Sequence, residues 1–439
     1  MRPFGKLYVQ VLIGVALGIA LGCAEPVFAT SLKPLGDAFI KAIKLMVGPI
    51  IFTTVVVGIA TMGDIRRVAS VGFKALVYFE IVSTLALVIG MVVGNVVPLG
   101  VGMNIDPGTF DPGSVASYVS QAKSLNLTDF LLNIIPATFV DPFAKGEILQ
   151  ILLIAVLLGL AICQLGARVR PVVDLLDLVA KALFGMVRVI MVAAPIAAFA
   201  AIAFTVGKFG VRTLLDLGGF VLAVFAVCLA FIVVVFGFVL RLCGFRLLQV
   251  LGYFKEEILF VFAATSSEAM MPPSMEKLER LGCSKEVVGL VMPAGFSFNM
   301  DGSAIYMSMA VLFIAHATNI DLSWSQQFVM LFVMLFTSKG AAGVAGGGFV
   351  ALAATMPAIG VLPVGGLTLL LGIDRFMSQI RAAVNLTSNI VATLVVARWT
   401  RAIDTVQAAR ELGGHRVPQV SASDDISADA ARSPASSRD

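Results

Sequence analysis

The stretch that decides the fold is VVGLVMPAGFSFNMDGS, residues 287–303, where an apolar run ends abruptly at Asn299 and Asp301. A second stretch, FVMLFVMLFTSKGAAGVAGGG at residues 328–348, has the same layout, with an apolar run that meets a glycine-rich segment. Irregular backbone at membrane depth is tolerated only where protein or a water-filled cavity satisfies its polar groups. The two stretches therefore predict membrane-embedded helices that are broken around a polar site.

The composition of the whole chain also indicates a membrane protein. Of its 439 residues, 59% are hydrophobic and 13% are charged, whereas soluble domains are about 45–50% apolar and about 25% charged. A bilayer-crossing helix needs about 20 apolar residues, and six runs of about that length precede residue 250. These runs cover residues 7–23, 39–62, 75–97, 148–165, 182–206 and 217–240. The net charge of +4, with no basic block interleaved with aromatics, gives no reason to expect nucleic-acid binding.

The distribution of Lys and Arg predicts the orientation of these spans. Basic residues gather in alternate loops, and they are thinner in the other loops. Because cytoplasmic loops carry the excess of Lys and Arg, we expect both termini to be cytoplasmic. Residues 98–128 then form an outer polar loop, and the tail at 401–439, rich in Ser, Ala and Asp, is expected to be disordered in the cytoplasm. The alternative for residues 1–23 is a cleaved signal peptide, but further spans follow at once, which favours a retained first span.

After residue 255 the chain contains two units, each a broken hairpin followed by a long helix. In the first unit, residues 258–264 meet a Ser-rich turn, and the broken stretch 287–303 follows. In the second unit, the glycine-rich stretch precedes a span at residues 367–398. Interrupted hydrophobic segments in corresponding halves point to a transporter site near the bilayer midplane.

The last span carries a polar face with an arginine at its centre. Asp374, Ser378, Arg381, Asn385 and Asn389 are spaced by four, three, four and four residues, so they fall within an arc of about 80° on one helix face. A central Arg costs about 2.5–3.5 kcal/mol on insertion scales, and that cost must be offset. Two explanations remain open: a structural ion pair with Asp374 or Asp301, or an anion site in which the guanidinium binds a carboxylate through two hydrogen bonds.

Oxygen-bearing side chains interrupt the span at residues 287–303. A helix broken at Asn299 and Asp301 exposes backbone carbonyls, and the two side chains add further oxygens. Hard oxygen ligands of this kind suit a cation such as sodium. The alternative is a capped helix kink without a ligand.

Three more polar or glycine-rich features are candidates for function. Ser266 and Ser267 at the first hairpin turn could offer hydroxyls and amides to an anion, or only cap a helix. The glycines of residues 340–348 could form a mobile gate, or only allow tight helix packing. Glu80, beside Ser83 and Thr84, fits helix–helix hydrogen bonding and cation binding equally well.

Taken together, these motifs resemble the dicarboxylate/amino acid:cation symporter family, in particular its bacterial four-carbon-dicarboxylate carriers. The likeness covers nearly the whole chain. It rests on residues 33–37 (KPLGD), 78–84 (YFEIVST), 299–302 (NMDG), 338–344 (SKGAAGV) and 372–377 (GIDRFM), together with the polar face of the last span.

The resemblance implies an all-α polytopic membrane protein with eight transmembrane helices, two re-entrant helical hairpins and inverted repeats. The hairpins are expected at about residues 256–280 and 326–361. Residues 255–400 would form a transport core that slides, like an elevator, against a scaffold of residues 1–254, with spans three and six partly associated with the core. A homotrimer is also implied.

The expected site consists of two sets of residues. The predicted substrate-binding set is Arg381, Asn385, Ser378, Ser266, Ser267, Ala342 and Gly343. The predicted cation set is Asn299, Asp301, Ser297, Gly295, Asn385, Asn389 and Ser338. We expect no cofactor beyond the coupling cation.

Three positions depart from the family pattern. Amino-acid-transporting relatives carry an acidic residue at the position of Ser378, where it holds the substrate's amino group. Sodium-coupled relatives carry Asp at the position of Asn389, which leaves the choice between sodium and protons open. Many relatives carry Pro where this chain has Ala345.

The expected function is uptake of succinate, fumarate or malate across the bacterial inner membrane, coupled to protons or sodium. The main alternative is an acidic or neutral amino acid:cation symporter of the same family, which Ser378 disfavours. An intramembrane hydrolase using Ser266 or Ser267 would need a base and a Gly-x-Ser-x-Gly turn, and neither Ser lies in such a turn. A membrane sensor would not need paired broken hairpins.

Overall fold

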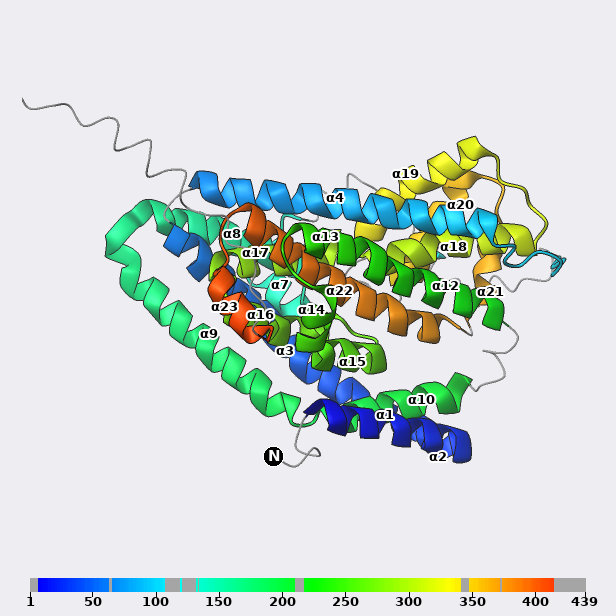
Figure 1. Ribbon diagram of the computed structural model, residues 1–439, viewed down its shortest axis with the longest axis horizontal. Helices are drawn as coiled ribbons and strands as arrows, with labels where there is room; N and C mark the ends of the chain where they lie inside the picture. Colours follow the sequence, from blue (N-terminus) through cyan, green and yellow to red (C-terminus); the bar gives the residue numbers. More distant parts are fainter. Residues whose placement is uncertain are drawn as a thin grey trace, which may run out of the picture.

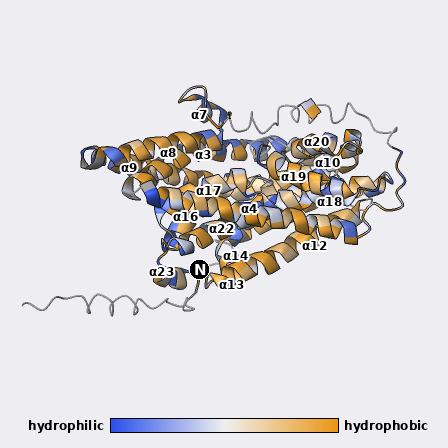
Figure 2. Cartoon of the chain, turned by 90° about the horizontal axis from the view of Figure 1, so that it is seen from above, coloured by the Kyte–Doolittle hydropathy of each residue, from blue (hydrophilic) through white to orange (hydrophobic). Residues whose placement is uncertain are grey.

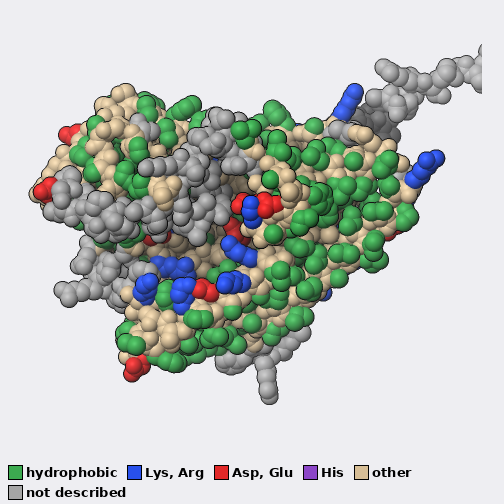
Figure 3. All heavy atoms as spheres, turned by 180° about the vertical axis from the view of Figure 1, so that it is seen from behind, with side chains coloured by type: hydrophobic (Ala, Val, Ile, Leu, Met, Phe, Trp, Pro, Cys, Tyr) green, Lys and Arg blue, Asp and Glu red, His purple; other side chains and the backbone are tan. Residues whose placement is uncertain are grey.

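The computed structural model describes residues 7–62, 65–106, 119–120, 132, 134–209, 217–340, 347–371 and 373–413. Helices make up almost all of these residues, and they pack side by side along a common direction (Figure 1). Hydrophobic side chains cover most of the helix surfaces, and hydrophilic residues concentrate at the helix ends (Figure 2). Seen from behind, hydrophobic side chains cover much of the surface, and Lys and Arg side chains gather near Asp and Glu toward its centre and lower left (Figure 3). The predicted all-α, multi-pass membrane architecture is confirmed.

Within the described residues, six helical segments are long and apolar enough to cross a bilayer. They are Pro26–Thr61, Arg66–Val96, Ile148–Leu165, Gly218–Leu242, Lys285–Ala317 and Asp374–Trp399. The bent pair Arg170–Met191 and Ala194–Lys208 counts as a seventh if its two helices form one span, and the first helix, α1 (Leu7–Ala24), is a shorter apolar helix. The expected single span at 182–206 is corrected: it is the end of α9 (Arg170–Met191) and α10 (Ala194–Phe209), which meet at 55°.

One group of helices from the first half of the chain packs together, and we refer to its members as the outer helices: α1, α2 (Pro26–Ser31), α3 (Lys33–Met62), α8 (Ile148–Leu165), α9 and α10. Helix α1 packs on α10 through a row of glycines spaced by four residues. A Cβ atom on Gly14, Gly18 or Gly22 would lie 2.6–2.7 Å from Pro195 O, Phe199 O or Val206 Cβ, respectively. Small residues at this spacing let two membrane helices approach closely, so α1 and α10 form one packed unit at the edge of the bundle (Figure 1).

The two broken hairpins occur where the sequence predicted them. The first hairpin, hairpin one, comprises α15 (Lys255–Ala264), η6 (Glu268–Met270) and α16 (Met271–Arg280). The second, hairpin two, comprises α19 (Trp324–Gly340) and α20 (Gly347–Ile359). The span expected at 367–398 begins later, at Asp374, because η7 (Val364–Leu367) and α21 (Thr368–Leu371) precede it as separate short turns.

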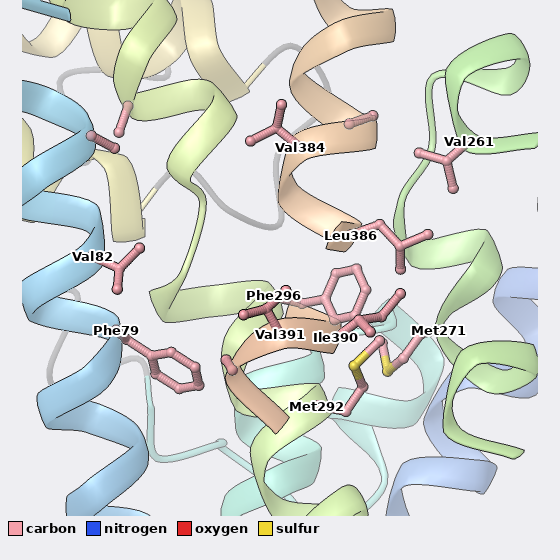
Figure 4. Close-up of a cluster of buried hydrophobic side chains, with 14 of the residues drawn as sticks. Phe79, Val82, Val261, Met271, Met292, Phe296, Val384, Leu386, Ile390 and Val391 are labelled. Carbon is pink, nitrogen blue, oxygen red and sulfur yellow. The ribbon is translucent and has the colours of Figure 1, made fainter. Parts of the chain in front are cut away.

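The most deeply enclosed helices are α22 (Asp374–Trp399) and the broken pair α17 (Lys285–Phe298) and α18 (Asp301–Ala317). An apolar cluster joins them to α4 (Ile65–Val96) and α16. Its members include Phe79, Met271, Met292, Phe296 and Ile390 (Figure 4). The polar face of α22 is therefore held in a fixed frame by apolar packing on its other sides.

The outer helices cover the two hairpins unequally. Hairpin one packs against α1, α3, α9 and α10. The main neighbours of hairpin two are α4 and α18, and its two arms also pack on each other. The main contacts of hairpin two are therefore with α4 and α18, whereas those of hairpin one include the outer helices.

Packing of α4 on α18 gives a stability prediction. A Cβ on Gly90 would lie 2.1 Å from Ser308 Oγ and 2.7 Å from Ile305 O, whereas one on Gly72 would meet only Leu290 Cδ2, at 3.9 Å. We expect Gly90→Ala to destabilise the protein by about 1–3 kcal/mol through overpacking, and Gly72→Ala on the same helix to be nearly neutral. Thermal unfolding in detergent would measure both, and equal melting temperatures for the two variants would contradict this packing.

Candidate functional site

The break between α17 and α18 is formed by two non-helical residues. Asn299 has φ −127° and ψ 69°, and Met300 has φ −107° and ψ 58°. Both residues lie within a continuous span, and Asn299 and Asp301 are fully buried. The broken helix predicted from the sequence is therefore present, with its polar side chains enclosed by protein.

Asn299 forms hydrogen bonds to α22, and one of its partners, Asn389, belongs to the predicted cation set. Its Nδ2 donates to Ser388 Oγ at 2.8 Å and to Asn389 Oδ1 at 3.0 Å. Gly295 lies against the side-chain amide of Asn389, because a Cβ on Gly295 would be 2.3 Å from Asn389 Oδ1. Within the described part of the chain, Asn299 Oδ1 is buried without a hydrogen-bond partner. This unsatisfied oxygen is available to a cation or to a water that solvates one.

Asp301 accepts hydrogen bonds from two hydroxyls. Ser83 Oγ of α4 donates to its Oδ1 at 2.9 Å, and Ser388 Oγ of α22 donates to its Oδ2. No Lys or Arg side chain forms an ion pair with Asp301 among the residues that the structure describes. A buried carboxylate without a counter-charge requires a proton or a cation to neutralise it. Asp301 is thus the group in this region that most needs a proton or a cation to neutralise it.

Asn385, expected in both sets, caps the start of α18. Its Oδ1 accepts from the backbone N–H groups of Gly302 at 2.8 Å and Ser303 at 3.4 Å. Its Nδ2 donates to Ser303 Oγ at 3.2 Å. Both ends of the amide are therefore used to tie α22 to the broken helix.

Arg381 is 6% exposed, and it is held from three directions. Its Nη2 donates to Ser378 Oγ at 2.5 Å and lies 3.0 Å from Asp374 Oδ1. Its guanidinium stacks on the ring of Tyr306 in α18, 4.4 Å from the ring centroid. The ion pair between Arg381 and Asp374 that was considered from the sequence is thus present. Asp301, the other partner considered, accepts hydrogen bonds from hydroxyls instead.

The other terminal nitrogen of the Arg381 guanidinium, Nη1, lies in a different environment from Nη2. Among the described residues, Nη1 is buried and has no hydrogen-bond partner. It lies beside the second arm of hairpin two, because a Cβ on Gly348 would be 2.4 Å from it. The guanidinium therefore presents an unused donor at the point where hairpin two closes over α22.

The remaining predicted residues are distributed around this centre. Ser297 is buried in the last turn of α17, and Ser266 and Ser267 are half-buried at the tip of hairpin one. The tip turns at Thr265, which has φ +58°. Ser338 Oγ donates to Leu335 O of its own helix at 3.4 Å, and no hydrogen bond in the described residues joins it to the cation set. Ala342 and Gly343, with most of the predicted gate, lie outside the described residues.

Sequence reasoning missed several contacts because they join distant helices. Tyr306 stacks on Arg381, Ser388 bonds both Asn299 and Asp301, and Lys339 pairs with Glu80. The polar cluster at Glu80 and Ser83 was one available signal. The structure divides it, with Ser83 bonded to Asp301 and Glu80 bonded to hairpin two.

Comparison with known proteins identifies the group to which this chain belongs. The model of the sodium:dicarboxylate symporter family matches residues 7–399. The C4-dicarboxylate transport protein 1 of Ralstonia nicotianae is 51% identical over 422 residues, which cover 96% of this chain and 99% of that protein. The C4-dicarboxylate transport protein of Burkholderia multivorans is 51% identical over 414 residues, 94% of this chain and 96% of its own. The chain is accordingly a transport protein rather than an enzyme, and it belongs to the sodium:dicarboxylate symporter family.

Proposed function

We propose that this chain takes up four-carbon dicarboxylates, namely succinate, fumarate and malate, from the periplasm into the cytoplasm together with protons or sodium. The observation that carries the proposal is the unpartnered Nη1 of Arg381, buried next to hairpin two. The relatives named as C4-dicarboxylate transport proteins support the substrate class.

Arg381 is arranged to bind one carboxylate of the substrate. Asp374 and Ser378 hold Nη2, and Tyr306 supports the guanidinium plane. This leaves Nη1 directed at hairpin two, where a carboxylate can complete its hydrogen bonding. Charge-assisted bonds from a guanidinium are among the strongest available to an anion, and a preorganised fork loses little entropy on binding.

The second carboxylate would be met by the hydroxyls of Ser266 and Ser267. Ser378 is the neighbour that favours a dianion over an amino acid, because it has no negative charge to hold an ammonium group. It accepts a hydrogen bond from Nη2 of Arg381, which leaves Nη1 for the substrate.

Asp301 and Asn299 would bind the coupling cation. Their carboxylate and amide oxygens are buried between α4, α18 and α22. The same helices carry Arg381 and Tyr306, so cation and substrate would each favour one arrangement of this core. That shared preference would couple the two bindings by a reciprocal free energy.

We also propose how the rest of the protein is arranged around this site. Residues 255–400 form the moving core and residues 1–254 the scaffold, in a homotrimer of the bacterial inner membrane with cytoplasmic termini. Hairpin two is proposed as the outer gate, and its separation from the outer helices, which pack against hairpin one, supports this assignment.

Uptake into liposomes containing the purified protein tests this function. Labelled succinate uptake is measured with an inward sodium gradient and an inward proton gradient imposed separately. Accumulation above equilibrium with at least one gradient supports symport and identifies the ion. If labelled succinate only reaches equilibrium across the membrane, and neither gradient changes its uptake, coupled transport is contradicted.

Substitution of Ser378 distinguishes a dicarboxylate transporter from an amino-acid transporter. A carboxylate at this position would lie one turn from Arg381, repel a dianion and partly neutralise the guanidinium. We expect Ser378→Asp to weaken succinate uptake by about tenfold or more and to strengthen competition by aspartate, whereas Ser378→Ala should be mild. The readout is inhibition of labelled succinate uptake by each acid. Unchanged selectivity in Ser378→Asp would remove Ser378 from the substrate site.

A further inference from the structure

An ion pair connects the outer helices to the tip of hairpin one. Lys44 Nζ of α3 lies 2.8 Å from Glu268 Oε2, the first residue of η6. Lys44 lies about three turns from the nearer end of α3, inside the membrane-spanning segment Pro26–Thr61. The Lys44 side chain is 53% exposed, and Glu268 is the ion-pair partner that the structure gives it.

Glu268 is also the residue that follows Ser267. Its side chain is 24% exposed, and it lies at the half-buried tip whose hydroxyls are proposed to receive a substrate carboxylate. A bare carboxylate at this position would repel a dianion, and the repulsion is strong where water is scarce. The tip therefore carries a group that opposes the proposed substrate unless its charge is cancelled.

We propose that Lys44 is a specificity-determining residue: it neutralises Glu268 and so allows the tip of hairpin one to accept the second carboxylate of a dianion. This inference rests on the proposed dicarboxylate transport. It differs from a purely structural role for the ion pair, because it makes the effect of Lys44 depend on the charge of the substrate.

The neutralisation also depends on the position of hairpin one. Lys44 belongs to α3, and Glu268 belongs to the hairpin that packs against it. One further ion pair crosses the same boundary, Arg188 of α9 to Glu276 of α16 at 2.6 Å. A movement of hairpin one along the outer helices would leave Glu268 without Lys44, and the unpaired carboxylate would then favour release of the dianion.

The test is a double-mutant cycle with Lys44→Gln, Glu268→Gln and the combined variant. Two quantities are measured in liposomes: the KM of labelled succinate, and inhibition by the monoamide of succinate, which carries one charge. Lys41→Gln is the matched control, because it removes the same charge one turn away on the same helix. Wild-type succinate uptake in the same assay reports on the proposed function independently.

We expect Lys44→Gln to raise the KM of succinate about tenfold, with a smaller change for the monoamide, because only the dianion brings its second charge to Glu268. Glu268→Gln should leave the KM near wild type or lower it, and the combined variant should match Glu268→Gln. Lys41→Gln should behave as wild type.

Three results would overturn the inference while wild-type uptake stays intact. One is an equal loss for succinate and its monoamide in Lys44→Gln. Another is a combined variant as impaired as Lys44→Gln alone. The third is a tenfold rise in the KM of succinate for Glu268→Gln. This result would overturn the inference even if Lys44→Gln does not reach the membrane.

Discussion

Arg381→Ala is expected to lower the kcat/KM of succinate uptake by about a hundredfold or more, because it removes the buried donor that binds a carboxylate and leaves Asp374 facing the site. Arg381→Lys keeps the charge but loses the planar fork, so we expect an intermediate loss of about tenfold. The measurement is the concentration dependence of labelled succinate uptake in liposomes with equal amounts of inserted protein.

Arg375→Ala is the matched control for this prediction. Arg375 lies on the same helix, but its Nε donates to Thr205 Oγ1 of α10 at 3.4 Å, away from Arg381. Its removal should change kcat/KM only modestly. Succinate uptake by Arg381→Ala at the wild-type rate would show that another group binds the substrate.

Asp301→Asn is expected to abolish uptake driven by a cation gradient. The amide keeps the size of the side chain, and its single oxygen can still accept from Ser83 or Ser388, whereas its Nδ2 would donate to the other hydroxyl, so the fold should persist. It lacks the charge that requires a cation in a buried site. Accumulation of succinate against its gradient should therefore disappear, while the variant still inserts into the membrane.

The control for Asp301 is Asp404→Asn, the same exchange at a helix cap. Asp404 caps α23 (Thr405–Glu411) by accepting from Val406 N and Gln407 N, and it lies outside the spans. Normal coupling is expected there. Cation-dependent accumulation by Asp301→Asn equal to that of the wild type would exclude Asp301 from the coupling site.

Much of the site's framework could be predicted because its signals are local. The hairpin bounds that the family resemblance implied, residues 256–280 and 326–361, correspond to helices that span Lys255–Arg280 and Trp324–Ile359. Polar interruptions of apolar runs mark breaks in helices directly, and the spacing of Arg381 and its neighbours fixes one face of α22. These features depend on residues close together in the chain.

The pairing of side chains across helices could not be predicted in the same way. Asn385 was predicted as a ligand, and its hydrogen bonds to α18 through both ends of the amide were not foreseen. Lys44 and Glu268 are far apart in sequence, so no periodicity links them. The bend between α9 and α10 was also missed, because the amphipathic start of α9 hides it from a search for apolar runs.

Competition against labelled succinate by wild-type protein tests the central claim most directly. Unlabelled succinate, fumarate, malate, aspartate and glutamate are compared in liposomes under the gradient that drives uptake. A dianion site formed by Arg381 with the uncharged Ser378 predicts that the three dicarboxylates compete strongly and the two amino acids weakly. Stronger competition by aspartate or glutamate than by succinate would contradict it and favour an amino-acid symporter.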